Sequence, residues 1–334
     1  MSGRVLLIGF GPTAASALAG LLGRVELLGV VRGALEPEDP VAALCAAHAV
    51  PLHQARSRRD VEALVLSLRP DATVISSYNR LLGPAVLETC PVFNVHYAPL
   101  PRYRGNAPVN WALLNGEAET AITVHRVGSG LDDGPILFQE AVAIGPEDNA
   151  TTLFARLNAI QERELGAAVR RGLEGAPGQP QDETRATYGC PRNPEDGEID
   201  WRRPAADIDR LTRALTPPFP GAFTHHQGTT LVVHRTGATT TGRRYVGTIP
   251  GRVIDVSPAG GWIDVLTGGG VLRVHEMSRS GEPPRPAAEI VTSRRARLGL
   301  RGHDLLQRIA DLEKRLGRLE SRRTKSSGSS GIDG

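Results

Sequence analysis

Apolar and polar positions follow two different periodicities along the chain. Within residues 1–180, short apolar runs such as Val5–Ile8 and Val25–Val31 alternate with stretches whose apolar residues recur at helical spacing. Ala72–Ser76 and Val92–His96 are further runs of the strand type. This alternation predicts an α/β fold with a Rossmann-like, doubly wound and mostly parallel sheet, in which ligands bind beyond the carboxyl ends of the strands.

The pattern changes after a long amphipathic stretch. Residues 150–174 have the apolar stripe of one helix, and Asn149 is placed to cap its start. Residues 181–204 are rich in Pro, Gly and charge, which is typical of a linker. Short strand signals separated by Gly-rich turns follow in residues 205–299, and they predict a smaller C-terminal β-barrel domain of OB-like type.

Residues 300–325 have the apolar spacing of a coiled-coil helix. Apolar side chains recur four and three positions apart over about two heptads. They are Leu305, Ile309, Leu312, Leu316 and Leu319. This seam predicts either a homodimer or a helix that packs back on the body, and the Ser/Gly-rich residues 326–334 are expected to be disordered.

The positive charge of the chain is concentrated at its C-terminal end. Residues 294–325 contribute +7, which leaves −4 for the remainder of a chain whose total is +3. The basic segment is typical of a solvated helix face, and it is also compatible with a nucleic-acid or acidic partner. Basicity therefore does not describe the body of the protein.

Composition also limits the compartment and the ligands. No apolar run reaches the roughly 18 residues of a membrane span, and Val5–Ile8 is too short for a signal sequence. Cys45, Cys90 and Cys190 are far apart and odd in number, so neither a zinc site nor a disulfide framework is indicated. We therefore expect a cytoplasmic protein that has no contact with membranes.

Gly9–Ala14 matches the G-x-G-x-x-A dinucleotide fingerprint after a strand. The second strand ends at Arg32, where an NAD enzyme would have an acidic residue, although an arginine suits the 2′-phosphate of NADP. We favour a tight strand–helix turn that needs small residues. An NADP-dependent reductase is the alternative from a different class, and a catalytically silent scaffold that dimerises through its C-terminal helix is another.

Candidate chemistry lies at the end of one strand and in one loop. Asn94 and His96 are two residues apart in an apolar run, so their side chains project to the same face. The turn-prone loop at residues 128–135 carries two carboxylates, Asp132 and Asp133. An amide for an oxyanion, an imidazole for proton transfer and a carboxylate to orient the imidazole together suit acyl transfer.

These motifs resemble those of the folate-dependent formyltransferase family, which includes methionyl-tRNA formyltransferases and amino-sugar N-formyltransferases. The resemblance rests on residues 94–96, 100–108, 118–125 and 131–134, and on the later segments 198–201 and 213–223. It implies 10-formyltetrahydrofolate as the formyl donor and no metal. It also implies a barrel-like C-terminal domain.

Roles follow from this resemblance residue by residue. Asn94 would stabilise the oxyanion, His96 would be the acid and base, and Asp132 would raise the pKa of His96 towards or above neutrality. Asp132 is preferred to Asp133 because the family pattern is Asp-x-Gly. The expected cofactor-binding residues are Arg80, Leu81, Leu82, Gly128 and Leu131, and the expected substrate-binding residues are Arg104 and Asn106.

The acceptor is inferred from charge. Residues 32–40 form a short acidic segment where tRNA-formylating relatives carry a basic insertion, and acid beside a phosphate backbone opposes binding. We therefore expect a small-molecule amine, foremost a nucleotide-linked amino sugar or another biosynthetic amine. Methionyl-tRNA is the alternative acceptor. We expect Trp111 to lie in the core and His125 to pack or to lie at the surface.

Overall fold

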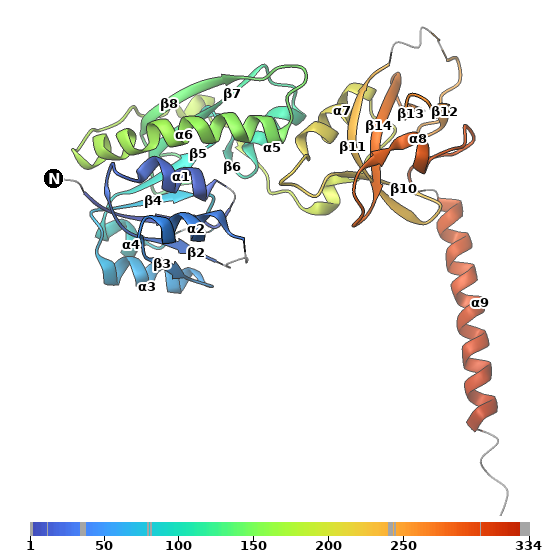
Figure 1. The fold of residues 1–334 in the computed structure, drawn as a ribbon, viewed down its shortest axis with the longest axis horizontal. Helices are drawn as coiled ribbons and strands as arrows, with labels where there is room; N and C mark the ends of the chain where they lie inside the picture. Colours follow the sequence, from blue (N-terminus) through green and yellow to red (C-terminus); the bar gives the residue numbers. More distant parts are fainter. Residues whose placement is uncertain are drawn as a thin grey trace, which may run out of the picture. The chain divides into compact units, whose positions relative to one another are not determined.

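The computed structural model describes residues 3–11, 13–33, 38–78, 80, 82–239, 243, 245–300 and 302–327. The chain forms two compact units (Figure 1). The first unit comprises residues 1–196 and 213–220, and the second comprises residues 197–212 and 221–334. No helix within the described ranges is long and apolar enough to cross a membrane.

A seven-stranded sheet is the centre of the first unit, in the order β3-β2-β1-β4-β5-β7-β8. Its strands are β1 (Arg4–Ile8), β2 (Glu26–Arg32), β3 (Leu52–Gln54), β4 (Ala72–Ser76), β5 (Val92–His96), β7 (Glu119–Arg126) and β8 (Ile136–Ala143). The strands β1 to β5 pair in parallel, whereas β7 is antiparallel to both β5 and β8. The predicted Rossmann-like, mostly parallel sheet is confirmed.

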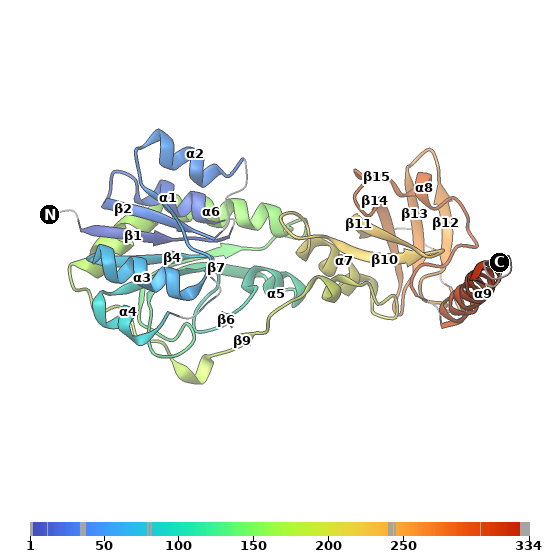
Figure 2. The same ribbon diagram turned by 90° about the horizontal axis from the view of Figure 1, so that it is seen from below.

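Helices cover both faces of this sheet (Figure 2). They are α1 (Ala14–Leu21), α2 (Pro40–Ala47), α3 (Arg58–Leu68), α4 (Pro84–Thr89), α5 (Pro108–Leu114) and α6 (Ala150–Leu173). Apolar residues of α1, α2 and α6 pack in one core cluster, and those of α3 and α4 pack in another. The remaining short elements are β6 (Arg104–Gly105), which pairs with β9 (Tyr188–Gly189), and the 3₁₀ turns η1 (Glu183–Arg185) and η2 (Pro194–Gly197).

The turn between β1 and α1 requires small residues for steric reasons. A Cβ at Gly9 would lie 2.5 Å from the Cβ of Ala14, and one at Gly11 would lie 2.5 Å from the Cβ of Ser77. Arg32 does not face an open phosphate site, because its guanidinium binds the Asp39 carboxylate at 2.8 Å and the Gly9 carbonyl at 2.6 Å. The prediction of a structural turn is confirmed, and these contacts speak against an NADP site.

The second unit is built on an antiparallel sheet with the main order β10-β11-β14-β13-β12. Its elements are most of α7 (Ala205–Ala214), β10 (Ala222–His226), β11 (Thr229–Ala238), β12 (Val253–Ser257), β13 (Trp262–Leu266), β14 (Val271–Arg279), β15 (Arg285–Pro286), α8 (Ala287–Ile290) and α9 (Gly302–Ser327). The predicted smaller C-terminal β-domain and C-terminal helix are confirmed. The helix continues two residues into the segment expected to be disordered, and residues 328–334 lie outside the described residues.

The long helix α6 ties the first unit together through one buried amide. Asn149 caps the helix as predicted, accepting a hydrogen bond from the Thr152 amide at 3.0 Å. Further along, the Gln161 amide nitrogen donates to the Thr13 carbonyl and to the Ser16 hydroxyl, both at 2.8 Å. Gln161 is fully buried, so these contacts fix α6 against the start of α1.

Replacing Gln161 with leucine should lower the free energy of unfolding by about 2 kcal/mol, because the Thr13 carbonyl and its neighbours then lose a partner without access to water. Chemical denaturation measures this change. Glu162→Leu, at the next and exposed position of α6, is the matched control and should change stability by less than about 0.5 kcal/mol. Equal effects of the two substitutions would show that the buried amide is not the cause.

Candidate functional site

The structure brings together the amide, imidazole and carboxylate that the sequence singled out. β5 lies inside the sheet between β4 and β7, and Asn94 and His96 project from one side of it. Asp132 reaches them from the loop between β7 and β8. The Asn94 amide nitrogen lies 3.1 Å from Asp132 Oδ1, and His96 Nδ1 lies 3.7 Å from Asp132 Oδ2.

Asp132 is the centre of this arrangement. Its backbone has a φ of 51°, in the left-handed region that aspartate tolerates better than most residues. The carboxylate accepts a further hydrogen bond from the Gly105 amide at 2.8 Å, and the Gln181 side chain donates to the Asp132 carbonyl at 2.7 Å. Burial favours the protonated acid, but the neighbouring His96, His125 and Gly105 amide hold the pKa of Asp132 well below its usual range.

His96 has a defined tautomer in this environment. Its Nε2 lies 2.7 Å from the Tyr103 carbonyl, which can only accept, so Nε2 carries the proton of the neutral ring. Nδ1 then has the free lone pair and faces Asp132. The pKa of His96 lies below its ordinary value, because burial outweighs the opposing effects of Asp132 and the Tyr103 carbonyl.

This balance corrects one expectation from the sequence. Asp132 does act to raise the pKa of His96, but it does not bring that pKa up to neutrality, since the imidazole is almost entirely buried. The ring is therefore neutral near pH 7 and ready to accept a proton at Nδ1.

His125 belongs to the same cluster, which the sequence reasoning missed. It stands opposite Asn94 in the β5–β7 register, and its Nδ1 donates to the Arg126 carbonyl at 3.0 Å. Its Nε2 is thus an acceptor, 3.2 Å from the Asn94 amide nitrogen and 3.5 Å from Asp132. The two amide hydrogens of Asn94 are directed at His125 and Asp132. The strand alternation around His125 was the available signal, because it places that side chain on one face with Thr123.

Only some of the residues expected to hold the cofactor lie near this cluster. Leu131 is 44% exposed next to Asp132, with its side chain beside Gly105. Gly128 packs against the Asp133 carboxylate. Arg80 donates to the Arg56 carbonyl at 3.2 Å. Leu82 packs with the core cluster of α3 and α4, and Leu81 lies outside the described residues.

The two residues expected to bind substrate differ from each other. Arg104 is 1% exposed, and its guanidinium forms a two-point ion pair with Glu183 at 2.6 and 2.9 Å. It also binds Gln181, so its donors are engaged within the protein. Its side chain is occupied in holding the segment around η1. Asn106 is exposed, and its backbone N–H donates to the Gly189 carbonyl at 3.1 Å.

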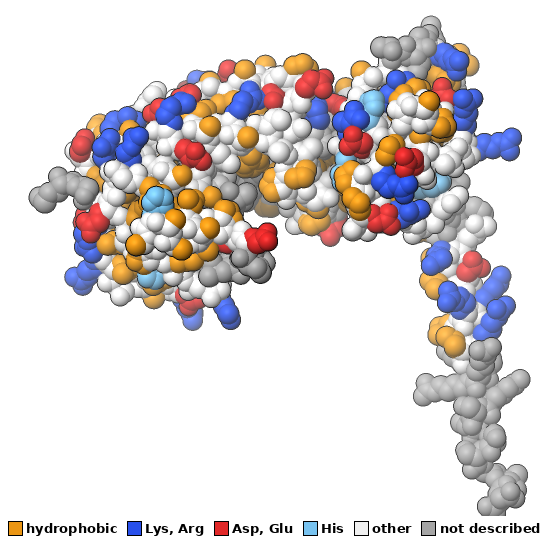
Figure 3. Space-filling view, viewed as in Figure 1, with side chains coloured by type: hydrophobic (Ala, Val, Ile, Leu, Met, Phe, Trp, Pro, Cys, Tyr) orange, Lys and Arg blue, Asp and Glu red, His pale blue; other side chains and the backbone are white. Residues whose placement is uncertain are grey.

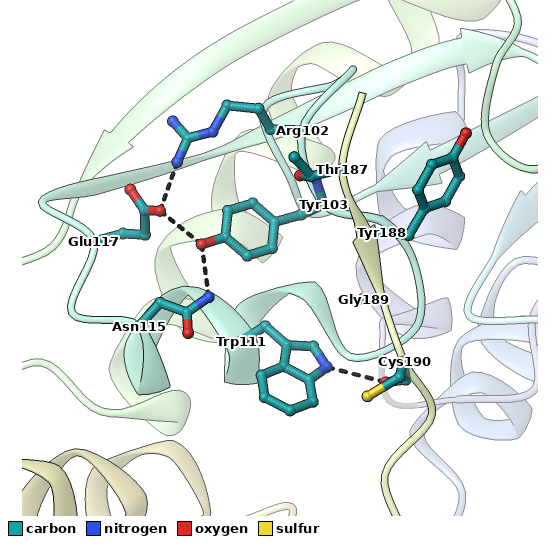
Figure 4. Close-up of a pocket in the computed structure, with 9 residues that line it drawn as sticks. All are labelled: Arg102, Tyr103, Trp111, Asn115, Glu117, Thr187, Tyr188, Gly189 and Cys190. Atoms are coloured by element: carbon teal, nitrogen blue, oxygen red, sulfur yellow. Dashed lines mark hydrogen bonds and ion pairs between the residues drawn. The ribbon is translucent and has the colours of Figure 1, made fainter. Parts of the chain in front are cut away.

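A cavity of about 420 Å³ lies beside this cluster (Figure 4). It is lined by Arg102, Tyr103, Trp111, Asn115, Glu117, Thr187, Tyr188, Gly189 and Cys190. Trp111 is partly exposed in this wall, so the expectation that it lies in the core is wrong. Its indole nitrogen donates to the Cys190 carbonyl at 3.0 Å, and the Arg192 guanidinium lies 5.1 Å from the centre of its ring.

Tyr103 connects the cavity to the cluster, because its carbonyl binds His96 while its ring lines the cavity. Its backbone has a φ of 60°, which is strained for an aromatic residue. The phenol donates to Glu117 at 2.6 Å and accepts from Asn115 at 3.0 Å, as Figure 4 shows. Arg102 also binds Glu117, so this carboxylate holds the loop in place.

The residues that the structure describes provide no preassembled set of metal ligands. No group of at least three His, Cys, Asp or Glu side chains is placed there to hold an ion. The cysteines Cys45, Cys90 and Cys190 are free, and Cys190 is the exposed member of this set.

The comparisons with known proteins agree on one family. Residues 28–169 match the formyl transferase family, and residues 192–295 match the formyl transferase C-terminal domain. The methionyl-tRNA formyltransferase of Anaeromyxobacter dehalogenans is 38% identical over 282 residues, which are 80% of this chain and 88% of that relative. That of Geobacter metallireducens is 34% identical over 281 residues, or 81% and 87% of the two chains.

A solved structure of similar fold is HypX from Aquifex aeolicus in complex with tetrahydrofolic acid. It matches 87% of this chain and 47% of its own, with a TM-score of 0.62 and 15% sequence identity. At this identity the likeness concerns the fold alone.

The expectation of a small-molecule amine acceptor, with tRNA as the less favoured partner, is wrong, because both relatives are named methionyl-tRNA formyltransferases. Asp39 is one of the acids in the segment at residues 32–40. In the structure Asp39 is buried, paired with Arg32, and accepts from the Val41 amide at the start of α2. A net charge summed over the body also says little about the one face that a nucleic acid contacts. Residues 34–37 lie outside the described residues.

Glu117→Gln should lower the pKa of His96, because a loosened Tyr103 carbonyl stabilises the imidazolium less. It should also reduce stability by about 1 kcal/mol at pH 7. Titration of the isotopically labelled His96 ring by NMR, together with denaturation, measures both effects. Glu119→Gln, an exposed position two residues along the chain, is the control. If both variants leave His96 titrating as in the parent protein, the carboxylate of Glu117 does not position the loop.

Proposed function

The chain belongs to the formyl transferase family, and from this premise we propose that it transfers a formyl group from 10-formyltetrahydrofolate to the amino group of methionyl-tRNA. The choice of acceptor rests on how much of the chain resembles methionyl-tRNA formyltransferases. The relative from Anaeromyxobacter dehalogenans shares 38% of residues over 88% of its own length. The match to the family's C-terminal domain extends the likeness beyond the unit that holds the proposed catalytic residues.

In this proposal the amino nitrogen attacks the formyl carbon and forms a new carbon–nitrogen bond. The carbonyl oxygen becomes an oxyanion, and Asn94 turns one amide hydrogen from Asp132 or His125 towards it. Such a donor in a site that excludes water is worth about 3 kcal/mol. The second amide hydrogen keeps its bond to the other partner, so Asn94 stays anchored while the first hydrogen moves to the oxyanion.

His96 moves the proton that this attack releases. The attacking nitrogen becomes cationic, and the neutral imidazole accepts its proton at Nδ1, where Asp132 stabilises the imidazolium that results. The same ring then gives the proton to the departing folate nitrogen as the old carbon–nitrogen bond breaks. Atoms and charge balance without a covalent enzyme intermediate or a metal.

The cavity beside Tyr103 suits the nucleic-acid end of the acceptor. Trp111 and the 63% exposed Tyr188 offer aromatic faces on which a base can stack, and Arg192 adds positive charge over the indole. We assign this cavity to the terminal nucleoside of the charged tRNA. A cytoplasmic location is part of this proposal, since charged tRNA is found there.

An assay of formyl transfer tests the acceptor. Methionyl-tRNA should be formylated with a kcat/KM of at least about 10⁴ M⁻¹s⁻¹, within the usual enzyme range. His96→Ala should lower kcat by about 10²- to 10⁴-fold, whereas His48→Ala, at an exposed position after α2, should keep full activity. Transfer to a nucleotide-linked amino sugar but not to methionyl-tRNA would overturn the choice of acceptor while leaving the family intact.

Asp132→Asn should reduce kcat about a hundredfold and move the acid limb of the pH profile to lower pH. The direction of this pH shift follows from the charges at the site. The Asp132 carboxylate raises the pKa of His96, so the loss of its charge lowers that pKa further. The parent enzyme should itself lose activity only below about pH 6.5, the ordinary pKa of histidine. Asp133→Asn, the neighbouring carboxylate, is the control and should leave the acid limb in place. An acid limb that moves upward in Asp132→Asn would contradict the assigned roles.

A further inference from the structure

The helix α9 presents a row of apolar side chains that nothing in the described structure covers. Leu305, Ile309, Leu312, Leu316 and Leu319 are each between 46% and 62% exposed. Figure 3 shows apolar and basic side chains along this helix. The match to the family's C-terminal domain ends at residue 295, so α9 is an addition to the part of the chain that the family model covers.

The spacing of this row defines a coiled-coil register. Ile309 and Leu316 occupy a positions, and the remaining three leucines of the row occupy d positions. Of the two a residues Ile309 is β-branched, and a β-branched residue at a with leucine at d favours two parallel strands. We propose that a second copy of this chain covers the row, and that the two α9 helices form a parallel, in-register coiled coil.

Charge complementarity supports this occupant and this orientation. Arg308 falls at a g position and Glu313 at the following e position, five residues ahead. In a parallel pair the g residue of one helix faces this e residue of the other, so arginine meets glutamate on both sides of the seam. The sequence repeats the same spacing at Arg315 and Glu320. In an antiparallel pair, g would face g, and arginine would meet arginine.

The outward positions of the helix do not interfere with this seam. Gly317 falls at a b position, where it lowers helix propensity without leaving a gap between the two copies. Lys314 falls at f, opposite the seam. Four acidic residues lie among the seven basic ones of this helix, and this mixture fits pairing of two copies better than a uniformly positive face for nucleic acid.

Sedimentation equilibrium of the full chain tests the assembly. At micromolar concentration the mass should be twice the 35.6 kDa of one chain. Leu312→Glu should return it to 35.6 kDa, and because Leu312 is 50% exposed in one chain, the variant should keep its fold. Lys314→Glu is the control and should remain dimeric. A parent protein that stays at the mass of one chain, or a Leu312→Glu variant that remains dimeric, overturns the proposal.

Charge exchange tests the register. Glu313→Arg should weaken the dimer about fivefold, because arginine then faces arginine on both sides of the seam. Adding Arg308→Glu to the same chain should restore the parent affinity, since the pair is then reversed and attractive again. If the double variant is as weak as the single one, the in-register parallel pairing is incorrect.

Cross-linking tests the direction of the helices. In a Cys190→Ser background, which removes an exposed thiol, Leu305→Cys should form a disulfide-linked dimer on mild oxidation. An antiparallel pair would instead link Leu305→Cys to Leu316→Cys in a mixture of the two variants, because a positions then face d positions, and that result overturns the proposal. RNA binding that Leu312→Glu abolishes, in a protein that is monomeric throughout, would also overturn it.

Discussion

The proposed active site depends on the interactions of the Asp132 carboxylate. It binds the Asn94 amide, lies beside the imidazoles of His96 and His125, and accepts from the Gly105 amide. These groups come from β5, from β7 and from the loop after β5. The Asn94 and Gly105 N–H donors, together with the two neighbouring imidazoles, keep this carboxylate ionised despite burial. The left-handed backbone at Asp132 is the local cost of placing the carboxylate there.

The loop after β5 adds a second constraint. Tyr103 uses its carbonyl to hold His96 and its phenol to bind Glu117, so one residue belongs both to the proton-transfer cluster and to the wall of the cavity. If an acceptor bound in that cavity moved Tyr103, the movement would therefore reach the His96 imidazole through the Tyr103 peptide group. The strained φ of Tyr103 is maintained because both ends of the residue are hydrogen bonded.

The local pairing of charges, and not their sum over the body, decides which charges a ligand meets. In the sequence, Asp39 belongs to an acidic segment and Arg104 is expected to bind substrate, yet each is buried beside an opposite charge, Arg32 and Glu183 respectively. Charges that are neutralised inside the body do not repel or attract a ligand at long range. The acidic balance of the body was therefore a poor guide to the acceptor, and the relatives named above are methionyl-tRNA formyltransferases.

The sequence by itself determined the elements that depend on local spacing. The apolar runs predicted the parallel strands, Asn149 marked the start of α6, and the i, i+2 spacing put Asn94 and His96 on one face. The motifs around them indicated the family. Only the tertiary structure decided what depends on distance and burial. It placed His125 in the cluster, gave Trp111 a place in a cavity wall, and made burial outweigh Asp132 in setting the pKa of His96. The physical reason is that solvent exclusion and through-space contact arise when segments far apart in the chain pack together, and local sequence patterns do not contain that information.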